Sequence, residues 1–330
     1  MKQPTPLVEI VSTGRYLPER VVTNVELELE MDTSDEWIRS RTGIGARHLA
    51  DDETGAAIMG AAAARDAMAE AGIEPGEIDL LVLSTATPDR WLPSTACDVQ
   101  TLLGCDNAFA FDLHAACSGF LFGLAMVEGY LTANRGDIAL VVSTEKMSAI
   151  VDWEDRSTCV LFGDGAGAAV VKRAEGDRGI LSSYMRSDGK LAELLWRPSG
   201  GVTDPMTEEV LRQRSHLVRM EGREVFKNAV RSMAEACGQA LARAGLTADD
   251  VDLLVPHQAN IRIIEATAKY AGLDMDRVFV NLDRYGNMSS ASIPVALDEA
   301  REQGLIREGS TVLSAAFGAG LTWGAMVWRF

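Results

Sequence analysis

The feature that most constrains the fold of this chain is an internal repeat. Residues 66–86 read DAMAEAGIEPGEIDLLVLSTA and residues 239–259 read QALARAGLTADDVDLLVPHQA, which align at an offset of 245 − 72 = 173 residues. Each copy indicates a helix that ends at glycine, a short acidic connection and then a buried strand. The same offset pairs Gly136–Leu140 with Gly309–Leu313. Two copies of this length indicate a duplicated domain rather than a solenoid.

Both halves have the pattern of an α/β protein. With 330 residues the chain is long for one core, so we predict two similar halves, residues 1–175 and residues 176–330. Helical patterns alternate with short β-rich runs, which is typical of internal strands. The segment Phe120–Thr132 is apolar on nearly every side, so it needs cover on both sides. Two sheets with this helix between them predict a layered α/β/α/β/α body.

Composition argues against several classes of protein. No window of about 18 consecutive apolar residues occurs, so a membrane span is not expected. The formal charge of −17 argues against nucleic-acid binding. The five cysteines show no CxxC spacing, and we predict neither a disulfide framework nor a metal site. Because Met1–Pro6 lack the apolar run of a signal peptide, we expect a cytoplasmic protein.

A cysteine lies where a predicted strand, Phe109–Leu113, gives way to the apolar helix. In the first turn of a helix, free N–H groups and the helix dipole lower the pKa of a thiol and hold a developing anion. Cys117 is flanked by small residues that leave room for a substrate carbonyl. The alternative is a buried packing residue, and a nucleophile would need basic partners elsewhere in the chain.

Four histidines could supply such a partner. His257 follows the predicted strand Val251–Val255. In α/β folds, binding sites commonly lie outside the carboxyl ends of the strands. It could equally be a histidine that caps a strand. His114, three residues before the cysteine, is the rival base, whereas His48 and His216 lie in charged surroundings and indicate surface positions.

Two further motifs have both structural and functional interpretations. Asn287 follows Gly286, and Gly-Asn is typical of a turn. The glycine-rich run Gly163–Gly167 could suggest a nucleotide loop, but the next residues, Ala168–Lys172, predict a strand rather than a helix. We therefore favour glycines that allow close backbone packing.

The sequence leaves the role of two surface features undecided. In the predicted helix 221–244, Arg223, Lys227 and Arg231 recur every four residues and repel one another unless an anion binds or solvent screens them. Residues 187–218 are rich in glycine, proline and polar residues. They predict a long loop, which could be a lid or a surface excursion.

Six motifs, in order along the chain, resemble those of β-ketoacyl-acyl carrier protein synthase III. They are Trp37–Ile44, Ala115–Gly119, Gly163–Ala168, Val255–Asn260, Tyr285–Asn287 and Phe317–Gly324. This is the thiolase-fold family that starts type II fatty acid synthesis. The resemblance implies a homodimer of subunits with a five-layer αβαβα fold made of two duplicated halves.

The resemblance also implies a catalytic set. Cys117 would take an acyl group from an acyl-CoA, for which acetyl-CoA is the expected starter. Backbone N–H groups of Cys117 and of one residue among Gly318, Ala319 and Gly320 would hold the oxyanion. Malonyl-acyl carrier protein would then enter, and His257 and Asn287 would donate to its thioester oxygen as CO2 leaves. No metal or redox cofactor is required.

Binding residues follow from the same resemblance. For CoA, Trp37 and Arg156 would bracket the adenine, Arg41 would meet the phosphates, and Asn260 would lie along the pantetheine tunnel. For the acidic carrier protein, the basic patch would consist of Lys227, Arg262 and Lys269.

Two departures from the family pattern concern the acyl pocket. His114 stands where the family usually has a small or apolar residue. The loop 191–218 is longer than in short members, and Trp91 and Leu92 lie near the expected end of the pocket, so the acyl-chain preference stays open.

Two alternative functions compete with this interpretation. One is a secondary-metabolism starter-unit ketosynthase or acyltransferase of the same fold, and the other is a non-catalytic dimeric acyl-CoA-binding protein.

Overall fold

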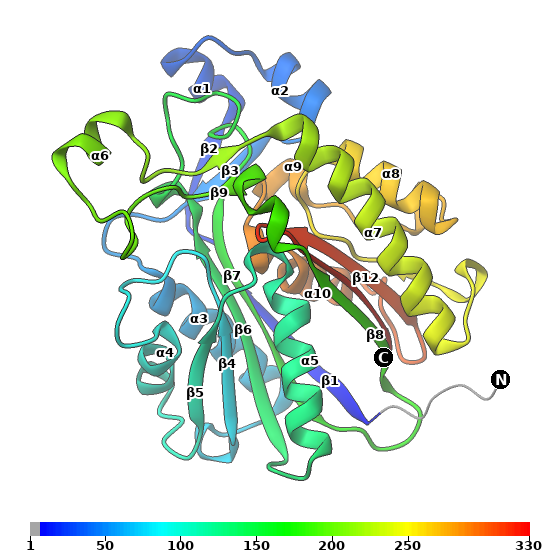
Figure 1. Cartoon of the computed structure of the whole chain (residues 1–330). Helices are drawn as coiled ribbons and strands as arrows, with labels where there is room; N and C mark the ends of the chain where they lie inside the picture. Colours follow the sequence, from blue (N-terminus) through cyan, green and yellow to red (C-terminus); the bar gives the residue numbers. More distant parts are fainter. Residues whose placement is uncertain (1–6) are drawn as a thin grey trace.

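A computed structural model describes residues 7–330 of the chain (Figure 1). The first six residues, on which the signal-peptide expectation rests, lie outside this range. Within residues 7–330, no helix combines the length and apolar character that a membrane span requires.

The first sheet has five strands in the order β1-β7-β6-β4-β5. Their bounds are β1 Val8–Tyr16, β4 Leu80–Ser84, β5 Phe109–Leu113, β6 Ile138–Lys146 and β7 Asp164–Arg173. Strand β4 is parallel to β5 and β6, whereas β7 is antiparallel to β6 and β1. All five residues of β4 are buried because the strand lies inside the sheet and helices cover both faces.

The second sheet has four strands in the order β11-β12-β13-β8. Their bounds are β8 Gly179–Ser187, β11 Leu253–Leu254, β12 Thr311–Gly318 and β13 Thr322–Arg329. The strand predicted over 251–255 is shorter than expected, but its backbone pairing with β12 continues through Val255 and His257, whose N–H groups donate to Leu313 and Ala315 at 2.8 Å each.

Helices form three layers around the two sheets, as Figure 1 shows. The outer helices α3 Ala56–Ala71 and α4 Thr95–Leu103 cover the first sheet, and α7 Gly222–Ala244, with α8 Ile261–Ala271 beside it, covers the second. Between the sheets lie α5 Gly119–Thr132 and α10 Ser292–Glu302, in one apolar core with strands of both sheets. The predicted five-layer αβαβα fold is therefore confirmed.

The smaller elements surround this body. They are β2 Arg20–Thr23, α1 Asn24–Glu30, α2 Asp35–Thr42, β3 Ala46–Leu49, η1 Pro75–Glu77, η2 Ala116–Ser118, η3 Met147–Ala149, η4 Gly189–Leu194, β9 Leu195–Trp196, α6 Glu208–Gln213, β10 Arg219–Met220, η5 Ala248–Asp250, η6 Met275–Arg277, α9 Leu282–Tyr285 and η7 Ser289–Ala291.

The repeat relates elements well beyond the segments in which it was found. Helices α3 and α7 end at Gly72 and Gly245, both left-handed with φ of 63° and 69°, a conformation that glycine adopts without strain. The short turns η2 and η7 start 289 − 116 = 173 residues apart, and α5 and α10 start 292 − 119 = 173 residues apart. The two turns that begin the central helices are therefore copies of one another.

Candidate active site

The cysteine turn joins the edge strand β5 to the central helix α5. Cys117 is the middle residue of the 3-10 turn η2 and lies two residues before the start of α5. Its side chain is 8% exposed, and Ala116 before it has a positive φ of 45°. A non-glycine residue with such a φ is strained and turns the chain sharply. The predicted position of Cys117 at a strand-to-helix turn is confirmed.

The expectation that the helix start lowers the pKa of this thiol is wrong. Burial raises the pKa of Cys117 to about 12, because a thiolate in a dry site loses its hydration. The hydrogen bond between Cys117 and Ser289 opposes the shift, and the charge of Glu145 adds to it. The thiol therefore stays protonated until a substrate or a proton acceptor changes its surroundings.

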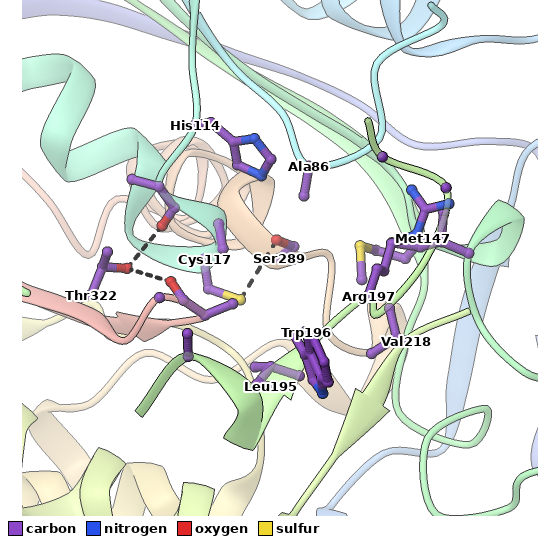
Figure 2. A pocket seen from close by; sticks show the side chains of 18 of the residues that line it. Ala86, His114, Cys117, Met147, Leu195, Trp196, Arg197, Val218, Ser289 and Thr322 are labelled. Atoms are coloured by element: carbon purple, nitrogen blue, oxygen red, sulfur yellow. Dashed lines mark hydrogen bonds between the residues drawn. The ribbon is translucent and has the colours of Figure 1, made fainter. Parts of the chain in front are cut away.

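Strand β12 ends directly against the cysteine turn. A Cβ atom added to Gly318 would lie 2.7 Å from the backbone nitrogen of Cys117, so only glycine allows this approach. The Thr322 hydroxyl donates to the carbonyls of Ala115 at 3.0 Å and Ala319 at 3.1 Å, which fixes the β12–β13 connection to the cysteine turn (Figure 2). The predicted oxyanion segment, Gly318 to Gly320, thus borders Cys117.

Asn287 lies in the loop between α9 and η7 and is buried. Its backbone is paired with the chain before β7, since its N–H donates to Leu161 at 2.8 Å and its carbonyl accepts from Gly163 at 3.1 Å. Its side-chain Oδ1 accepts the N–H of Ser289 at 2.9 Å. The carboxamide oxygen is therefore occupied, and Nδ2 is the end available to a substrate.

His257 is buried at the end of the β11 segment. Its Nδ1 lies 2.6 Å from the hydroxyl of Ser292, at the start of α10, and that hydroxyl also accepts the N–H of Gln258 at 3.3 Å. Burial lowers the pKa of His257 to about 3, so the imidazole is neutral at physiological pH. Because Ser292 occupies Nδ1, Nε2 is the ring nitrogen that remains available to a substrate.

The two copies of the repeated turn face each other at the site. Ser289 in η7 has a positive φ of 47°, matching the 45° of Ala116 in η2. The Cys117 thiol donates to the Ser289 hydroxyl at 3.5 Å, as Figure 2 shows. The nucleophile turn of one half thus contacts the equivalent turn of the other half.

A cavity of about 440 Å³ opens in front of Cys117 and Ser289. Its wall is mainly apolar and includes Met147, Ile150, Phe162, Leu195, Trp196 and Val218. His257 and Asn287 are not among its lining residues. Asn287 nevertheless begins the segment 287–292, and His257 contacts Ser292 at its end. The same segment contacts the cysteine turn through Ser289.

The acyl-pocket residues have different surroundings. Trp91 lines the cavity, whereas Leu92 does not and is 85% exposed in the single chain. His114 lines the cavity on the side of Ala86 (Figure 2). The long loop 187–218 contains η4, β9 and α6 and leads into β10. Part of the cavity wall comes from its residues Trp196, Arg197, Ser199, Gly200 and Gly201. The loop is therefore more than surface decoration.

The residues predicted to bind CoA form one cluster beside α2. The guanidinium groups of Arg41 and Arg156 lie 5.0 Å and 5.4 Å from the centre of the Trp37 ring. Asn260 caps α8, accepting the N–H of Arg262 at 2.9 Å, and its Nδ2 donates to the Arg41 carbonyl at 3.1 Å. Since the Arg156 guanidinium lies over the Trp37 ring, an adenine between them would need this group to move.

The predicted basic patch is exposed on α7 and α8. Lys227, Arg262 and Lys269 are all exposed. The ammonium of Lys227 lies 2.6 Å from the carboxylate of Glu224 on the same helix. This ion pair partly compensates the row of like charges formed by Arg223, Lys227 and Arg231. Arg262 packs over the ring of Phe226 at 5.6 Å.

The glycine-rich run has the structural role that the sequence favoured. Residues from Asp164 onward form strand β7. Cβ atoms on Gly165 and Gly167 would lie 2.6 Å from the sulfur of Met288 and 2.8 Å from Pro294. These glycines let the first sheet pack closely under α10 and the Asn287 loop.

Sequence reasoning missed Ser289 and Ser292 as residues of the site. Both stand in a run of small residues after Asn287, and a serine in such a run is typical of many turns. The repeat contained the signal that could have found Ser289, because the offset of 173 places it opposite Ala116 in the cysteine turn.

This fold and site define a class. Two duplicated halves in five αβαβα layers, with a buried cysteine at the start of a central helix, make this a thiolase-fold condensing enzyme. A family model described as "3-Oxoacyl-[acyl-carrier-protein (ACP)] synthase III" matches residues 111–189, and its C-terminal counterpart matches residues 241–330.

Similar proteins agree along almost the whole chain. The β-ketoacyl-[acyl-carrier-protein] synthase III of Caldanaerobacter subterraneus subsp. tengcongensis is 48% identical over 96% of both chains, and that of Symbiobacterium thermophilum is 50% identical over 98% of both. The crystal structure of 3-oxoacyl-[acyl-carrier-protein] synthase III from Aquifex aeolicus is 46% identical and has a TM-score of 0.91. The match covers 98% of this chain and 100% of the Aquifex chain. The chain belongs to the β-ketoacyl-acyl carrier protein synthase III family and is an acyltransferase of fatty acid synthesis.

Proposed function

We propose that this enzyme condenses an acyl-CoA starter, with acetyl-CoA as the expected one, with malonyl-acyl carrier protein. The products are 3-oxoacyl-acyl carrier protein, CoA and CO2. The observation that carries the proposal is the contact between the cysteine turn and the end of β12, where a Cβ on Gly318 would meet the Cys117 nitrogen at 2.7 Å. Cys117 lines an apolar cavity together with Ala319 and Gly320, which supports acylation at this position.

The first half-reaction transfers the acyl group to Cys117. The sulfur attacks the thioester carbonyl, whose oxygen becomes negative. This oxygen accepts hydrogen bonds from the backbone N–H groups of Cys117 and of the Gly318 to Gly320 segment. The bond between the carbonyl carbon and the CoA sulfur then breaks. CoA leaves, and an acyl-cysteine stays in the cavity.

The second half-reaction uses His257 and Asn287 as hydrogen-bond donors. The Ser292 contact at Nδ1 leaves the Nε2–H of His257 to donate, and the Ser289 contact at Oδ1 leaves the Nδ2 of Asn287. Both would hold the malonyl thioester oxygen while CO2 departs, which stabilises the enolate that attacks the acyl-cysteine. The proposed chemistry requires neither a metal nor a redox cofactor.

Substrate binding follows the two basic clusters described above. The cluster of Trp37, Arg41 and Arg156, held to α8 through Asn260, offers an aromatic face and two guanidinium groups to CoA. The exposed patch of Lys227, Arg262 and Lys269 offers positive charge on a chain of net charge −17, which suits an acidic carrier protein.

A homodimer fits the exposed edge of the first sheet. Strand β5 is the last strand of that sheet, and its Phe109 and Phe111 are 50% and 36% exposed. Met126 on α5 is 55% exposed, and Tyr130 of the same helix contacts the ring of Phe109. An uncovered aromatic edge strand beside an apolar helix is a surface that a second copy would cover.

A secondary-metabolism starter ketosynthase is the second candidate. The priming β-ketosynthase of the R1128 polyketide pathway is 36% identical, with a TM-score of 0.91 over 100% of this chain and 98% of its own. The cavity of about 440 Å³ would hold more than an acetyl group, which favours testing longer starters. Identities of about 48% over 96% of the chain to fatty acid enzymes favour the first candidate.

The test is a competition between acyl-CoAs of different length and branching. Wild-type protein is given each acyl-CoA and then malonyl-acyl carrier protein, and the 3-oxoacyl products are measured by mass spectrometry. We expect acetyl-CoA to give the highest kcat/KM. A preference for a long or specialised starter would favour the second candidate, and binding of acyl-CoA with no turnover would indicate a non-catalytic protein.

A further inference from the structure

An arginine side chain lies in the wall of the cavity that Cys117 lines. Arg197 directly follows β9 and is half-buried. It is one of the lining residues of the cavity of about 440 Å³, whose wall is otherwise mainly apolar. Figure 2 shows it on the far side of the cavity from Cys117 and Thr322. The mechanism above gives this positive charge no role.

Most of this guanidinium has no partner in the protein. Its Nε donates to the carbonyl of His216 at 2.8 Å, and within the described part of the chain its Nη1 and Nη2 form no further hydrogen bond or ion pair. Other arginines of the same region do pair with an acid, since Arg214 and Arg219 lie 2.5 Å and 3.5 Å from the carboxylate of Asp152. Arg197 differs from them in that both terminal nitrogens are available to a ligand.

The surroundings of Arg197 are unfavourable for an unpaired charge. Burial lowers the pKa of Arg197, because a guanidinium loses hydration as it is buried. The group still carries its charge at physiological pH, since a guanidinium is too basic to lose its proton there. An anion that enters the cavity would therefore gain charge-assisted hydrogen bonds that no carboxylate of the described chain already uses.

The backbone on both sides of Arg197 is fixed. Trp196 pairs with Arg219 in the two-stranded sheet of β9 and β10. The N–H of Ser199 donates to the carbonyl of Ser215 at 3.1 Å. The contact of Nε adds a third attachment, on the side chain itself. The guanidinium is thus held in place before a ligand binds, which lowers the entropy cost of binding.

Arg197 also lies where this cavity meets a second one, of about 520 Å³. The residues that line both are Trp91, Ile150, Arg197 and Gly200. The second cavity has further charged lining residues, Asp52, Asp89, Arg90 and Lys146, none of which lines the first. Arg197 is therefore the charged group that the two cavities share, and it is the one that an acyl chain on Cys117 meets in its own cavity.

We propose that Arg197 binds the terminal carboxylate of a dicarboxylic starter, which is an acyl-CoA whose chain ends in a carboxylate instead of a methyl group. The proposal rests on the proposed acylation of Cys117 and adds a second class of starter beside acetyl-CoA. The carboxylate accepts hydrogen bonds from Nη1 and Nη2. The transfer is that of the first half-reaction: the Cys117 sulfur bonds to the carbonyl carbon, the bond from this carbon to the CoA sulfur breaks, and the thiol proton leaves on CoA.

A purely structural arginine is the alternative. The contact of Arg197 with the His216 carbonyl joins two parts of the long loop 187–218. If this contact were the whole role of the side chain, its loss would loosen the cavity wall and change acylation by all starters alike. An arginine that binds substrate instead distinguishes chains that end in a carboxylate from chains that end in a methyl group.

The test measures acylation of Cys117 by pairs of acyl-CoAs with equal numbers of carbons. The pairs are succinyl- and butyryl-CoA, glutaryl- and pentanoyl-CoA, and adipyl- and hexanoyl-CoA, and each second-order rate constant is measured by rapid quench and intact mass. We expect the wild type to be acylated by at least one dicarboxylic member. For that pair, Arg197→Met should lower the ratio of the charged to the neutral rate constant roughly 10- to 100-fold, the size expected for hydrogen bonds to a charged group.

Two further variants complete the test. Arg197→Lys keeps the positive charge and should retain part of the wild-type ratio. Arg212→Met removes an equal charge from α6, outside the cavity, and should leave the ratio unchanged. An unchanged ratio in Arg197→Met, an equal fall in Arg212→Met, or a wild type that accepts acetyl-CoA but no dicarboxylic starter would overturn the proposal. A wild type that no acyl-CoA acylates, acetyl-CoA included, would overturn the proposed function itself.

Discussion

At the scale of the residue, the site depends on two side chains whose free ends are set by a neighbour. Ser292 occupies Nδ1 of His257, and the Ser289 N–H occupies Oδ1 of Asn287. Each contact leaves one nitrogen, Nε2 of His257 and Nδ2 of Asn287, for the proposed hydrogen bonds to the malonyl thioester, and neither needs a charged group. Two neutral donors suit an enolate that forms in an apolar cavity, because they need no counter-charge in the resting enzyme.

Removing either donor should separate the two half-reactions. We expect His257→Ala and Asn287→Ala to be acylated by acetyl-CoA at close to the wild-type rate but to lose decarboxylation of malonyl-acyl carrier protein by about 10²–10³-fold. Acylation is measured by intact mass and decarboxylation by release of labelled CO2. Loss of acylation alone in either variant would contradict the assigned roles.

The pH dependence of the second step follows from the same burial. The pKa of His257 is lowered to about 3, so the imidazole gains a proton only as the pH falls toward that value. Decarboxylation by the wild type should therefore show no inflection near pH 6.5 between pH 5 and 9. An inflection there that disappears in His257→Gln would mean that the imidazole titrates as an exposed histidine does.

At the scale of the element, the carboxyl end of β12 and the start of α5 act as one unit. The closeness of Gly318 to Cys117 leaves no room for a side chain, and Thr322 fixes the connection that follows. The N-cap residue of α5, Ser118, makes no side-chain capping hydrogen bond, so no side chain satisfies the N–H groups of the first turn.

Gly318→Ala should therefore act on the nucleophile directly. The added methyl would meet the Cys117 backbone at 2.7 Å and push the two segments apart. We expect acylation to fall by at least about tenfold, since backbone donors must stay within hydrogen-bond distance of the oxyanion. Gly238→Ala on α7, where a Cβ meets nothing within 4 Å, is the control and should stabilise the fold by about 0.5–1 kcal/mol. Equal acylation rates in the two variants would show that this contact is unimportant.

Helices α7 and α8 should select the carrier protein. Reversing the charge of Lys227 and Arg262 together is expected to raise the KM for malonyl-acyl carrier protein several-fold at low salt, with a smaller effect at high salt, because exposed charges are screened. Acylation by acetyl-CoA should not change. Arg135→Glu, exposed beyond the end of α5, is the control, and an equal rise in KM there would mean that only net charge matters.

At the scale of the whole molecule, the duplication explains both what the sequence could predict and what it could not. The offset of 173 predicted two similar halves, and the segment Phe120–Thr132, apolar on nearly every side, predicted a helix between their sheets. Both are local patterns in the sequence. The raised pKa of Cys117 and its contact with Ser289 depend on how deeply the two halves bury their shared turns. Burial between distant segments leaves no local pattern.

The exposed edge of β5 predicts how two molecules associate. We expect Phe111→Glu to convert a dimer to a monomer in analytical ultracentrifugation, because a buried unpaired carboxylate is costly at an interface. Leu305→Glu, also at an exposed apolar residue, should leave the dimer intact. A monomeric wild type, or a dimer that survives Phe111→Glu, would argue against this edge as the interface.

The most direct test of the account is the site of the acyl group after the first half-reaction. Wild-type protein is incubated with acetyl-CoA, digested and mapped by tandem mass spectrometry, beside Cys117→Ala and the buried-cysteine control Cys237→Ala. We predict one acetyl group on the peptide that contains Cys117, present in Cys237→Ala and absent in Cys117→Ala. An acetyl group that persists on the Cys117→Ala protein, or that maps to another residue of the wild type, would contradict the account.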